Sequence, residues 1–132
     1  MYHSICEHIG KEKHNKWRVK PKDFEKQMKW FYDNKWNSFT ISELIKLDEI
    51  PKKSFDDGYE DNFINAFPIL KKYNFKATIY LVPNQSINHW EEKNTSVLSN
   101  LLNNEQILQM QNSGLIEFGS HTMSHMNLSK IE

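Results

Sequence analysis

The stretch KATIYLV, residues 76–82, constrains the fold of this chain more than any other segment. It is mostly apolar, rich in β-branched residues and followed by Pro83, so it is predicted to be a buried strand. The stretch LIEFGS, residues 115–120, is predicted to be another strand, and residues 103–113 a helix that ends at Gly114. This alternation is typical of parallel strands joined by helical crossovers.

The same alternation extends toward the N-terminus. MYHSI (residues 1–5) and KKSF (residues 52–55) are predicted to be short strands, and residues 38–40 are a weaker candidate. Residues 23–34 have apolar side chains at helical spacing and are predicted to be a helix. The members expected on its apolar face are Phe24, Met28, Phe31 and Tyr32. The sequence therefore predicts an α/β fold with parallel strands.

Two further helices and one long loop are expected. Thr40 and Glu43 match a capping box, which predicts a helix from there through Leu47, closed by Pro51. Apolar residues also repeat at helical spacing over residues 63–70, with Pro68 inside the repeat. That helix is therefore expected to kink or to form two pieces. The polar residues 84–100 are predicted to form a long loop of the kind that often carries function.

Bulk composition excludes several classes of protein. The 132 residues correspond to about one domain, and the 17 basic and 17 acidic residues cancel, which argues against nucleic acid as the main partner. The basic stretch of residues 10–22 is predicted to be a solvated loop. Cys6 has no second cysteine to pair with and is expected to be a small buried residue. No transmembrane segment or signal peptide is visible in this chain.

Polar side chains follow two of the predicted strands. Asp56 and Asp57 come directly after residues 52–55, and His121 and His125 follow residues 115–120. The carboxyl ends of parallel strands meet at one edge, so the two pairs should lie together. Two imidazoles and a carboxylate are good zinc ligands, and such hydrolytic sites keep one position open for water.

Neighbouring carboxylates repel each other, and a cation would relieve that repulsion. Adjacent residues that leave a strand diverge, so one carboxylate can bind the metal while the other faces its water. Gly58 permits the sharp turn away from the site. Each motif alone also fits a plain structural role, because DDG is a common turn and two histidines four residues apart often form polar surface. Their joint placement after two strands favours the metal site.

SFDDGYEDN, AFPILKKYNFKATIYLV and GSHTMSHMNLSKI together resemble the polysaccharide deacetylases of the NodB-homology type, carbohydrate esterase family 4. The first motif of that family is T/S-F-D-D-G and the second is H-S/T-x-x-H. The strand MYHSI resembles the opening strand of many members. The resemblance implies an irregular (β/α) barrel, a divalent metal that is usually zinc, and hydrolysis of N-acetyl groups on an amino-sugar polymer or oligomer. It also suggests a cell-envelope or extracellular location.

Carried over to this sequence, the resemblance makes Asp57, His121 and His125 the metal ligands and Asp56 the general base. The backbone N–H of Tyr59 would help to hold the oxyanion. The family's second motif has a small hydroxyl residue, and Thr122 occupies that position. His3, on the opening strand, is expected to line the pocket or support the structure rather than bind the metal.

The sequence departs from the family in two places. The later motifs, which include the leucine-histidine segment that supplies the general acid, normally lie beyond the second histidine and are absent. In addition, only three residues, KKS, separate Pro51 from Phe55, where members usually carry several apolar residues. Ser129 and Glu132 fit a capping box at the end of the chain. Residues 1–132 are therefore expected to be the N-terminal part of one deacetylase domain, inactive as a fragment.

Two other functions remain open on these residues. The chain could be a non-catalytic remnant that binds carbohydrate or metal, or a hydrolase of small non-sugar amides. Within the long loop, His89 and Trp90 are candidates for contact with a sugar, because an aromatic ring stacks well on the apolar face of a sugar. Exposed loop aromatics without a ligand are the alternative.

Overall fold

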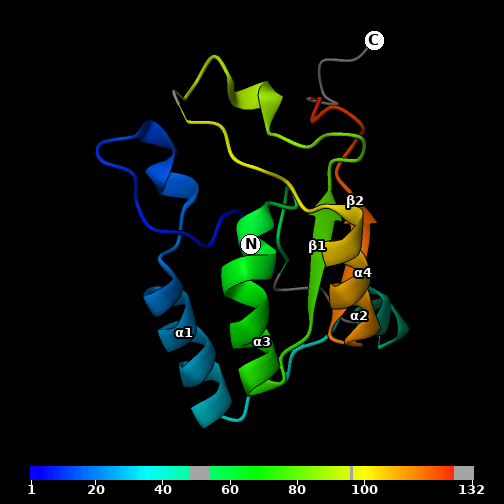
Figure 1. The fold of residues 1–132 in the computed structure, drawn as a ribbon. Coiled ribbons are helices and arrows are strands. Elements are labelled where there is room, and N and C mark those ends of the chain that lie inside the picture. The colour runs from blue at the N-terminus through cyan, green and yellow to red at the C-terminus, as the bar shows by residue number, and fades with distance from the viewer. Residues whose placement is uncertain (48–53, 96, 127–132) are drawn as a thin grey trace.

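Two parallel strands form the centre of the molecule. The structure is a computed structural model that describes residues 1–47, 54–95 and 97–126. Strand β1 (Ala77–Leu81) pairs with β2 (Ile116–Ser120) in parallel, with Ala77 opposite Ile116 and Leu81 opposite Ser120. Both strands lie within the ranges predicted from their apolar runs, and helix α4 (Asn104–Asn112) connects them (Figure 1).

Two shorter extended segments continue this sheet on the side of β1. Phe55 forms parallel bridges with both Ile79 and Tyr2. The Phe55 N–H donates to the Thr78 carbonyl at 2.9 Å, and the Asp56 N–H donates to the Tyr2 carbonyl at 2.9 Å. The spatial order of these segments is their order in the chain, which is the arrangement of part of a (β/α) barrel.

The two short segments are not full strands, contrary to the expectation for residues 1–5 and 52–55. Bridges form only at Tyr2, Ser4 and Phe55, and Lys52 and Lys53 lie outside the described residues. One cause is that the Ile5 N–H donates at 2.8 Å to the side chain of Asp61 instead of to a neighbouring strand. The ladder of backbone hydrogen bonds therefore stops early.

Helix α1 (Pro21–Asp33) begins two residues before the predicted start, because proline is well suited to the first turn of a helix. Phe24 and Met28 are buried, as expected. Tyr32 is 58% exposed, so its placement on the buried face was wrong. It contacts Tyr73 instead, at 5.6 Å between ring centroids, near the end of the helix where the apolar stripe no longer faces the sheet.

Helix α2 (Ile41–Lys46) has the predicted capping box, in which Thr40 accepts from the Glu43 N–H and Glu43 accepts from the Thr40 N–H. The candidate strand at residues 38–40 does not form. The Ser38 hydroxyl instead accepts the Lys76 N–H at 2.6 Å, just before β1. Pro51, expected to close this region, lies outside the described residues.

The segment around Pro68 is divided, as predicted. A π-helix, η2 (Asn62–Ala66), leads into α3 (Phe67–Tyr73), and Pro68 lies in the first turn of α3, where its missing N–H is tolerated. The basic stretch of residues 10–22 contains a 3-10 helix, η1 (Lys13–Trp17), and the start of α1. The long loop after β1 contains another, η3 (His89–Glu91).

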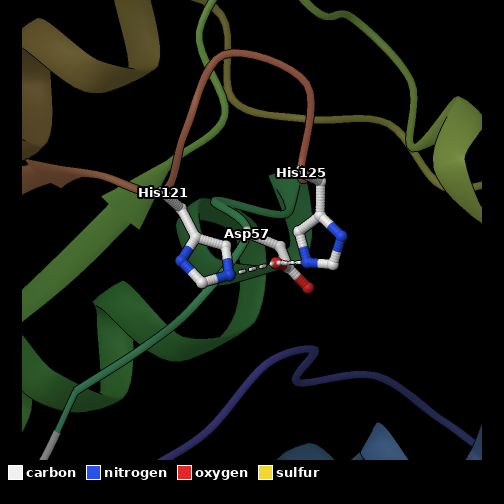
Figure 2. A group of neighbouring side chains, drawn as sticks. All are labelled: Asp57, His121 and His125. Carbon is white, nitrogen blue, oxygen red and sulfur yellow. Dashed lines mark ion pairs between the residues drawn. The ribbon is translucent and has the colours of Figure 1, made fainter. Parts of the chain in front are cut away.

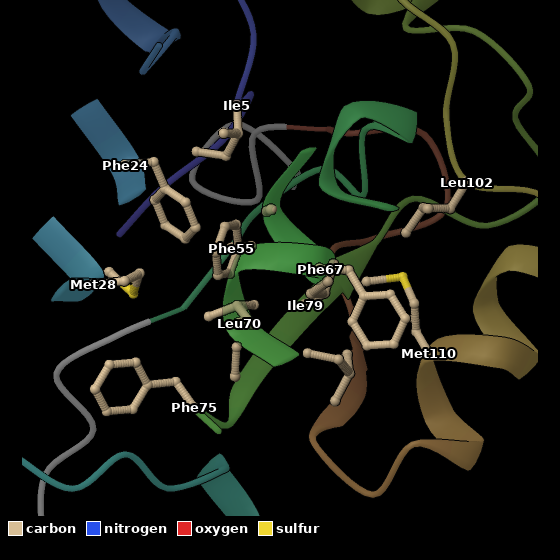
Figure 3. Close-up of a cluster of buried hydrophobic side chains, with 13 residues drawn as sticks. Ile5, Phe24, Met28, Phe55, Phe67, Leu70, Phe75, Ile79, Leu102 and Met110 are labelled. Carbon is tan, nitrogen blue, oxygen red and sulfur yellow. The ribbon is translucent and has the colours of Figure 1, made fainter. Parts of the chain in front are cut away.

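The core lies between the helices and the sheet. Aromatic and aliphatic side chains from α1, α3 and α4 meet those of the strands (Figure 3). The cluster comprises Ile5, Phe24, Met28, Phe55, Ala66, Phe67, Leu70, Phe75, Ala77, Ile79, Leu102, Met110 and Ile116. This packing holds the strands so that their carboxyl ends, with the long loops, lie at one end of the molecule (top in Figure 1).

Candidate active site

Asp56, Asp57, His121 and His125 all lie just beyond the carboxyl ends of the extended segments. The two aspartates follow Phe55 directly, and His121 is the first residue after β2. The His121 N–H donates to the Leu81 carbonyl at 2.7 Å, so the pairing of β1 with β2 continues as far as the first histidine. The backbone of His121 is thereby fixed by the sheet itself.

Three of these side chains converge on one place. The Nε2 atoms of His125 and His121 lie 3.1 and 3.4 Å from the Oδ1 atom of Asp57. One ligand atom from each residue can be chosen so that all three lie within 4.8 Å of one another. Figure 2 shows the two imidazoles on opposite sides of the Asp57 carboxylate.

The Oδ1 atom of Asp57 is buried and has no hydrogen-bond partner within the described part of the chain. The two ring nitrogens are close enough to bond it, so their orientation is what prevents a hydrogen bond. A buried carboxylate oxygen without a partner is costly. The two ring nitrogens and the carboxylate oxygen face a common space without forming hydrogen bonds to one another, which suits a bound cation. Two imidazoles with a carboxylate fit Zn²⁺ and similar divalent ions.

The backbone is strained at these same positions. Asp57, Thr122 and His125 have positive φ angles of 72°, 66° and 54°. Residues other than glycine rarely adopt positive φ angles, and a β-branched residue such as Thr122 does so least readily. Strained residues of this kind concentrate at functional sites, where the surrounding structure holds them in place.

Gly58 completes the turn that carries Asp57. Its φ is 66°, and a Cβ atom added there would lie 2.6 Å from Cδ2 of Leu81. Both the backbone angle and the close approach of β1 therefore require glycine at this position. The predicted role of Gly58 in a sharp turn is confirmed.

Burial dominates the electrostatics of Asp57. Removal from water raises the pKa of its carboxyl above the ordinary value, and the neighbouring Asp56 raises it further. The charges of three histidines, in decreasing order His125, His3 and His121, act in the opposite direction without overcoming burial. A bound cation would add a much stronger influence in favour of the ionised form.

Asp56 and Tyr59 flank the cluster. Asp56 is 8% exposed and is anchored through its N–H to the first extended segment, but it is not one of the three converging residues. The backbone N–H of Tyr59 has no acceptor among the hydrogen bonds of the described residues, so it is free to donate. Burial raises the pKa of the Tyr59 hydroxyl, which accepts a long hydrogen bond from Asn88 at 3.4 Å.

His3 lies close enough to the cluster for its charge to affect the pKa of Asp57. It is absent from the converging set, and its charge lowers the pKa of Asp57. Its ring contacts Trp17 at 4.8 Å between centroids, and its carbonyl accepts the Asn62 side chain at 2.8 Å. The opening segment thus brings a third imidazole to this end of the sheet.

The network that holds this opening segment was not predicted from the sequence. Asp61 accepts the Ser4 hydroxyl at 2.5 Å, the Ile5 N–H at 2.8 Å and the Asn62 side chain at 2.9 Å. The polar run EDN (residues 60–62), about one helical turn after Asp57, is the sequence feature from which this network could have been predicted. Cys6, expected to be buried, is partly exposed because its thiol lies in this polar network, 3.0 Å from the Ser4 hydroxyl.

The long loop after β1 contributes to the site at two points. A cavity of about 570 Å³ opens beside Asp57, and Asn84, Gln85 and Ser86 line it together with residues at the start of α4. Trp90 stacks on the His125 ring, with 4.8 Å between centroids and 17° between planes. His89 is paired with Glu92, 2.5 Å apart, on the exposed side of the loop. The turn that carries the second motif is closed by a hydrogen bond, in which the Thr122 hydroxyl accepts the Met126 N–H at 3.2 Å.

Comparison with known proteins gives a consistent result. Residues 53–132 match the family model described as polysaccharide deacetylase. A Bacillus subtilis (strain 168) protein named "Putative polysaccharide deacetylase YxkH" is 37% identical over 98% of this chain and 43% of its own length. The poly-beta-1,6-N-acetyl-D-glucosamine N-deacetylase of Staphylococcus aureus (strain MRSA252) is 34% identical over 85% of this chain and 39% of its own.

A solved structure extends the likeness to the fold. The crystal structure of the "putative polysaccharide deacetylase BA0330" from Bacillus anthracis superposes with a TM-score of 0.76 and 29% identity. The match covers 99% of this chain and 40% of that one. The chain thus spans about two fifths of the length of these relatives. None of the helices in the described residues is long and apolar enough to cross a membrane.

Proposed function

This chain belongs to the polysaccharide deacetylase family, and we propose that it carries the metal-binding part of a hydrolase that removes N-acetyl groups from an amino-sugar polymer. The observation that carries the proposal is the convergence of Asp57, His121 and His125 around a buried carboxylate oxygen without a hydrogen bond. Their nitrogen and oxygen atoms would hold a divalent cation, for which we favour Zn²⁺.

The reaction is the hydrolysis of an amide. A cation bound by these residues would supply a Lewis acid that polarises the acetamide carbonyl and makes water more acidic. Asp56, adjacent to the ligand and outside the converging set, would accept a proton from the attacking water at its carboxylate. The free N–H of Tyr59 would donate to the oxygen on which negative charge develops.

The leaving amine needs a proton, and two sources are open for it. From the family resemblance of the sequence, the acid is expected on a segment beyond His125. A second assignment, in which the His3 imidazole protonates the amine, is supported by the hydrogen bond from the Asp56 N–H to the carbonyl of the neighbouring Tyr2, which holds the opening segment beside the site, and by the effect of the His3 charge on Asp57. If His3 is the acid, replacing it with alanine should remove turnover and leave metal binding intact.

The substrate class follows from the relatives and from the cavity. Relatives such as the Staphylococcus aureus protein are named for deacetylation of poly-beta-1,6-N-acetyl-D-glucosamine. The cavity of about 570 Å³ beside Asp57 falls within the range typical of small-molecule sites and would accept one acetylated sugar unit. Polar side chains at residues 84–86 and apolar ones such as Leu101 and Ile107 both line it, which suits a sugar with hydroxyl groups and an apolar face.

The test is acetate release from a soluble β-1,6-linked N-acetylglucosamine tetrasaccharide, measured with Zn²⁺ present and after chelation. We expect one Zn²⁺ per chain and, if His3 supplies the acid, acetate release that depends on the metal and on Asp56. A chain that binds no divalent cation, or acetate release that chelation does not affect, would contradict the proposal. Zinc binding without acetate release from this chain would favour an acid beyond His125 over His3.

A further inference from the structure

Trp90 contacts the candidate site from a separate part of the chain. It lies in η3, within the loop after β1, and its indole stacks on the imidazole of His125. The loop is anchored close by, because the Asn88 N–H donates to the Ser99 carbonyl at 3.1 Å and the Ser99 N–H donates to Asn88 Oδ1 at 2.6 Å. Asn88 is 3% exposed, so Trp90 projects from a fixed point of the loop.

His125 needs such support more than His121 does. The sheet fixes the backbone of His121, whereas His125 lies beyond it at a φ of 54°, in a turn closed by the Thr122 hydroxyl. Metal-binding histidines usually donate their second ring N–H to a partner that sets the plane of the ring. Within the described residues His125 makes no such hydrogen bond. Its ring is tilted by 58° against that of His121 and lies nearly parallel to that of Trp90, and a stacked face is the contact better suited to fix the plane of the ring.

The indole nitrogen of Trp90 raises a second question. Nε1 is buried and has no hydrogen-bond partner within the described residues. Burying an N–H without an acceptor costs stability, so such a group in a native protein calls for an explanation. A ligand that brings an oxygen atom beside His125 would supply the missing acceptor.

We propose that Trp90 is a positioning residue of this site. The face of its ring holds the plane of the His125 imidazole for metal binding, and its N–H donates a hydrogen bond to an oxygen of the bound acetylated sugar. The second part rests on the proposed function, whereas the first requires only the metal. The two parts use different atoms of one side chain, so different substitutions separate them.

Zinc affinity tests the first part. Trp90→Leu removes the ring, and we expect about 10-fold weaker Zn²⁺ binding, the lower end of the range for partners that orient metal ligands. Trp90→Phe keeps a ring face and should restore affinity to within about 2-fold of the original chain. Trp36→Leu is the matched control, because Trp36 is 50% exposed and packs on Trp30 and Phe31. It should bind Zn²⁺ as the original chain does.

Calorimetric titration with Zn²⁺ gives these affinities, and thermal unfolding of the metal-free proteins checks that each variant folds. Trp90→Met, which is longer and more flexible than leucine and also has no ring, repeats the comparison if Trp90→Leu does not fold. Equal Zn²⁺ affinity in the original chain and in a folded variant without the ring would overturn the positioning role. Weak binding in Trp90→Phe as well would also overturn it.

Binding of the β-1,6-linked N-acetylglucosamine tetrasaccharide to the zinc-loaded chain tests the second part. Trp90→Phe keeps an aromatic face and loses the N–H, and the loss of one neutral hydrogen bond should weaken binding by about 3- to 10-fold. If the original chain binds the tetrasaccharide and Trp90→Phe binds it equally well, the N–H has no such role and the proposed function stands. If the original chain does not bind it, both this role and the proposed substrate class are refuted.

Discussion

Asp57 is a buried carboxylate and Asp61, four residues later, is a partly buried one, and the structure treats them in opposite ways. Burial raises the pKa of both above the ordinary value. Asp61 accepts hydrogen bonds from Ser4, Ile5 and Asn62, whereas Oδ1 of Asp57 accepts none within the described residues. Two imidazole nitrogens approach Asp57 instead, at 3.1 and 3.4 Å.

The difference distinguishes a structural carboxylate from a ligand-binding one. Donors from its own chain offset part of the cost of burying Asp61, and in return it holds the opening segment against the π-helix η2. At Asp57 the histidine charges offset part of the cost, but Oδ1 has no hydrogen bond within the described residues and the backbone is strained, which a protein tolerates where a ligand will bind. Four substitutions can break or sharpen this contrast.

The largest effect is expected for Asp56→Asn, which tests whether the carboxylate next to Asp57 has a third role. A positioned base contributes roughly 10²- to 10⁴-fold in rate, so acetate release should fall by that factor. Zinc affinity should stay within about 2-fold, because Asp56 is not one of the converging residues. Parallel kinetics and calorimetry check this, and a joint loss of metal and turnover would give both aspartates one role.

Asp57→Asn should weaken Zn²⁺ binding by more than about 100-fold, since it removes a ligand rather than a residue that orients one. The metal-free protein should be as stable as before or more stable, because a buried carboxylate with one oxygen that lacks a hydrogen bond is replaced by a neutral amide. Calorimetric titration and thermal unfolding measure the two properties. A clear loss of stability in the metal-free variant would show that Asp57 is structural after all.

Asp61→Ala should have the opposite profile. Three donors lose their acceptor, and we expect a loss of about 3 kcal/mol in the free energy of unfolding, at about 1 kcal/mol for each unsatisfied group. Urea denaturation of the metal-free protein measures this loss. Where the variant is folded, its zinc affinity should remain within about 10-fold of the original chain. A large loss of zinc affinity with little change in the free energy of unfolding would remove the contrast with Asp57.

Gly58→Ala should destabilise the protein by about 2 kcal/mol, the smallest of the four effects, because it combines a disfavoured φ with a clash against Leu81. The clash involves the end of a flexible side chain, which can move. Urea denaturation measures the change. A neutral result would mean that the Asp57 turn adapts without cost and that its geometry is not fixed by the glycine.

The sequence predicted the regular parts of the fold well. The β1 and β2 strands are apolar runs bounded by Pro83 and Gly114, and the Thr40 cap is a local side-chain pattern, so short windows of sequence contain the information. The meeting of Asp56, Asp57, His121 and His125 at one edge of the sheet also follows from the order of strands and helices alone. These features share one property, which is that each depends on residues near one another in the chain or on the order of its elements.

The features that the sequence did not predict depend on distant contacts. The opening segment pairs with Phe55 only briefly because Asp61, over fifty residues away, takes the Ile5 N–H. The stacking of Trp90 on His125 joins two loops, and no local pattern distinguishes it from an exposed aromatic. Tyr32 has the correct helical spacing, but α1 extends past the core before reaching it.

The central claim is that Asp57, His121 and His125 bind one divalent metal ion. Anomalous diffraction at the zinc absorption edge, from crystals of the chain grown with Zn²⁺, tests it most directly. We predict one strong peak about 2.0–2.3 Å from a carboxylate oxygen of Asp57 and from one ring nitrogen of each histidine. Zinc bound elsewhere while this position has no anomalous peak would contradict the account.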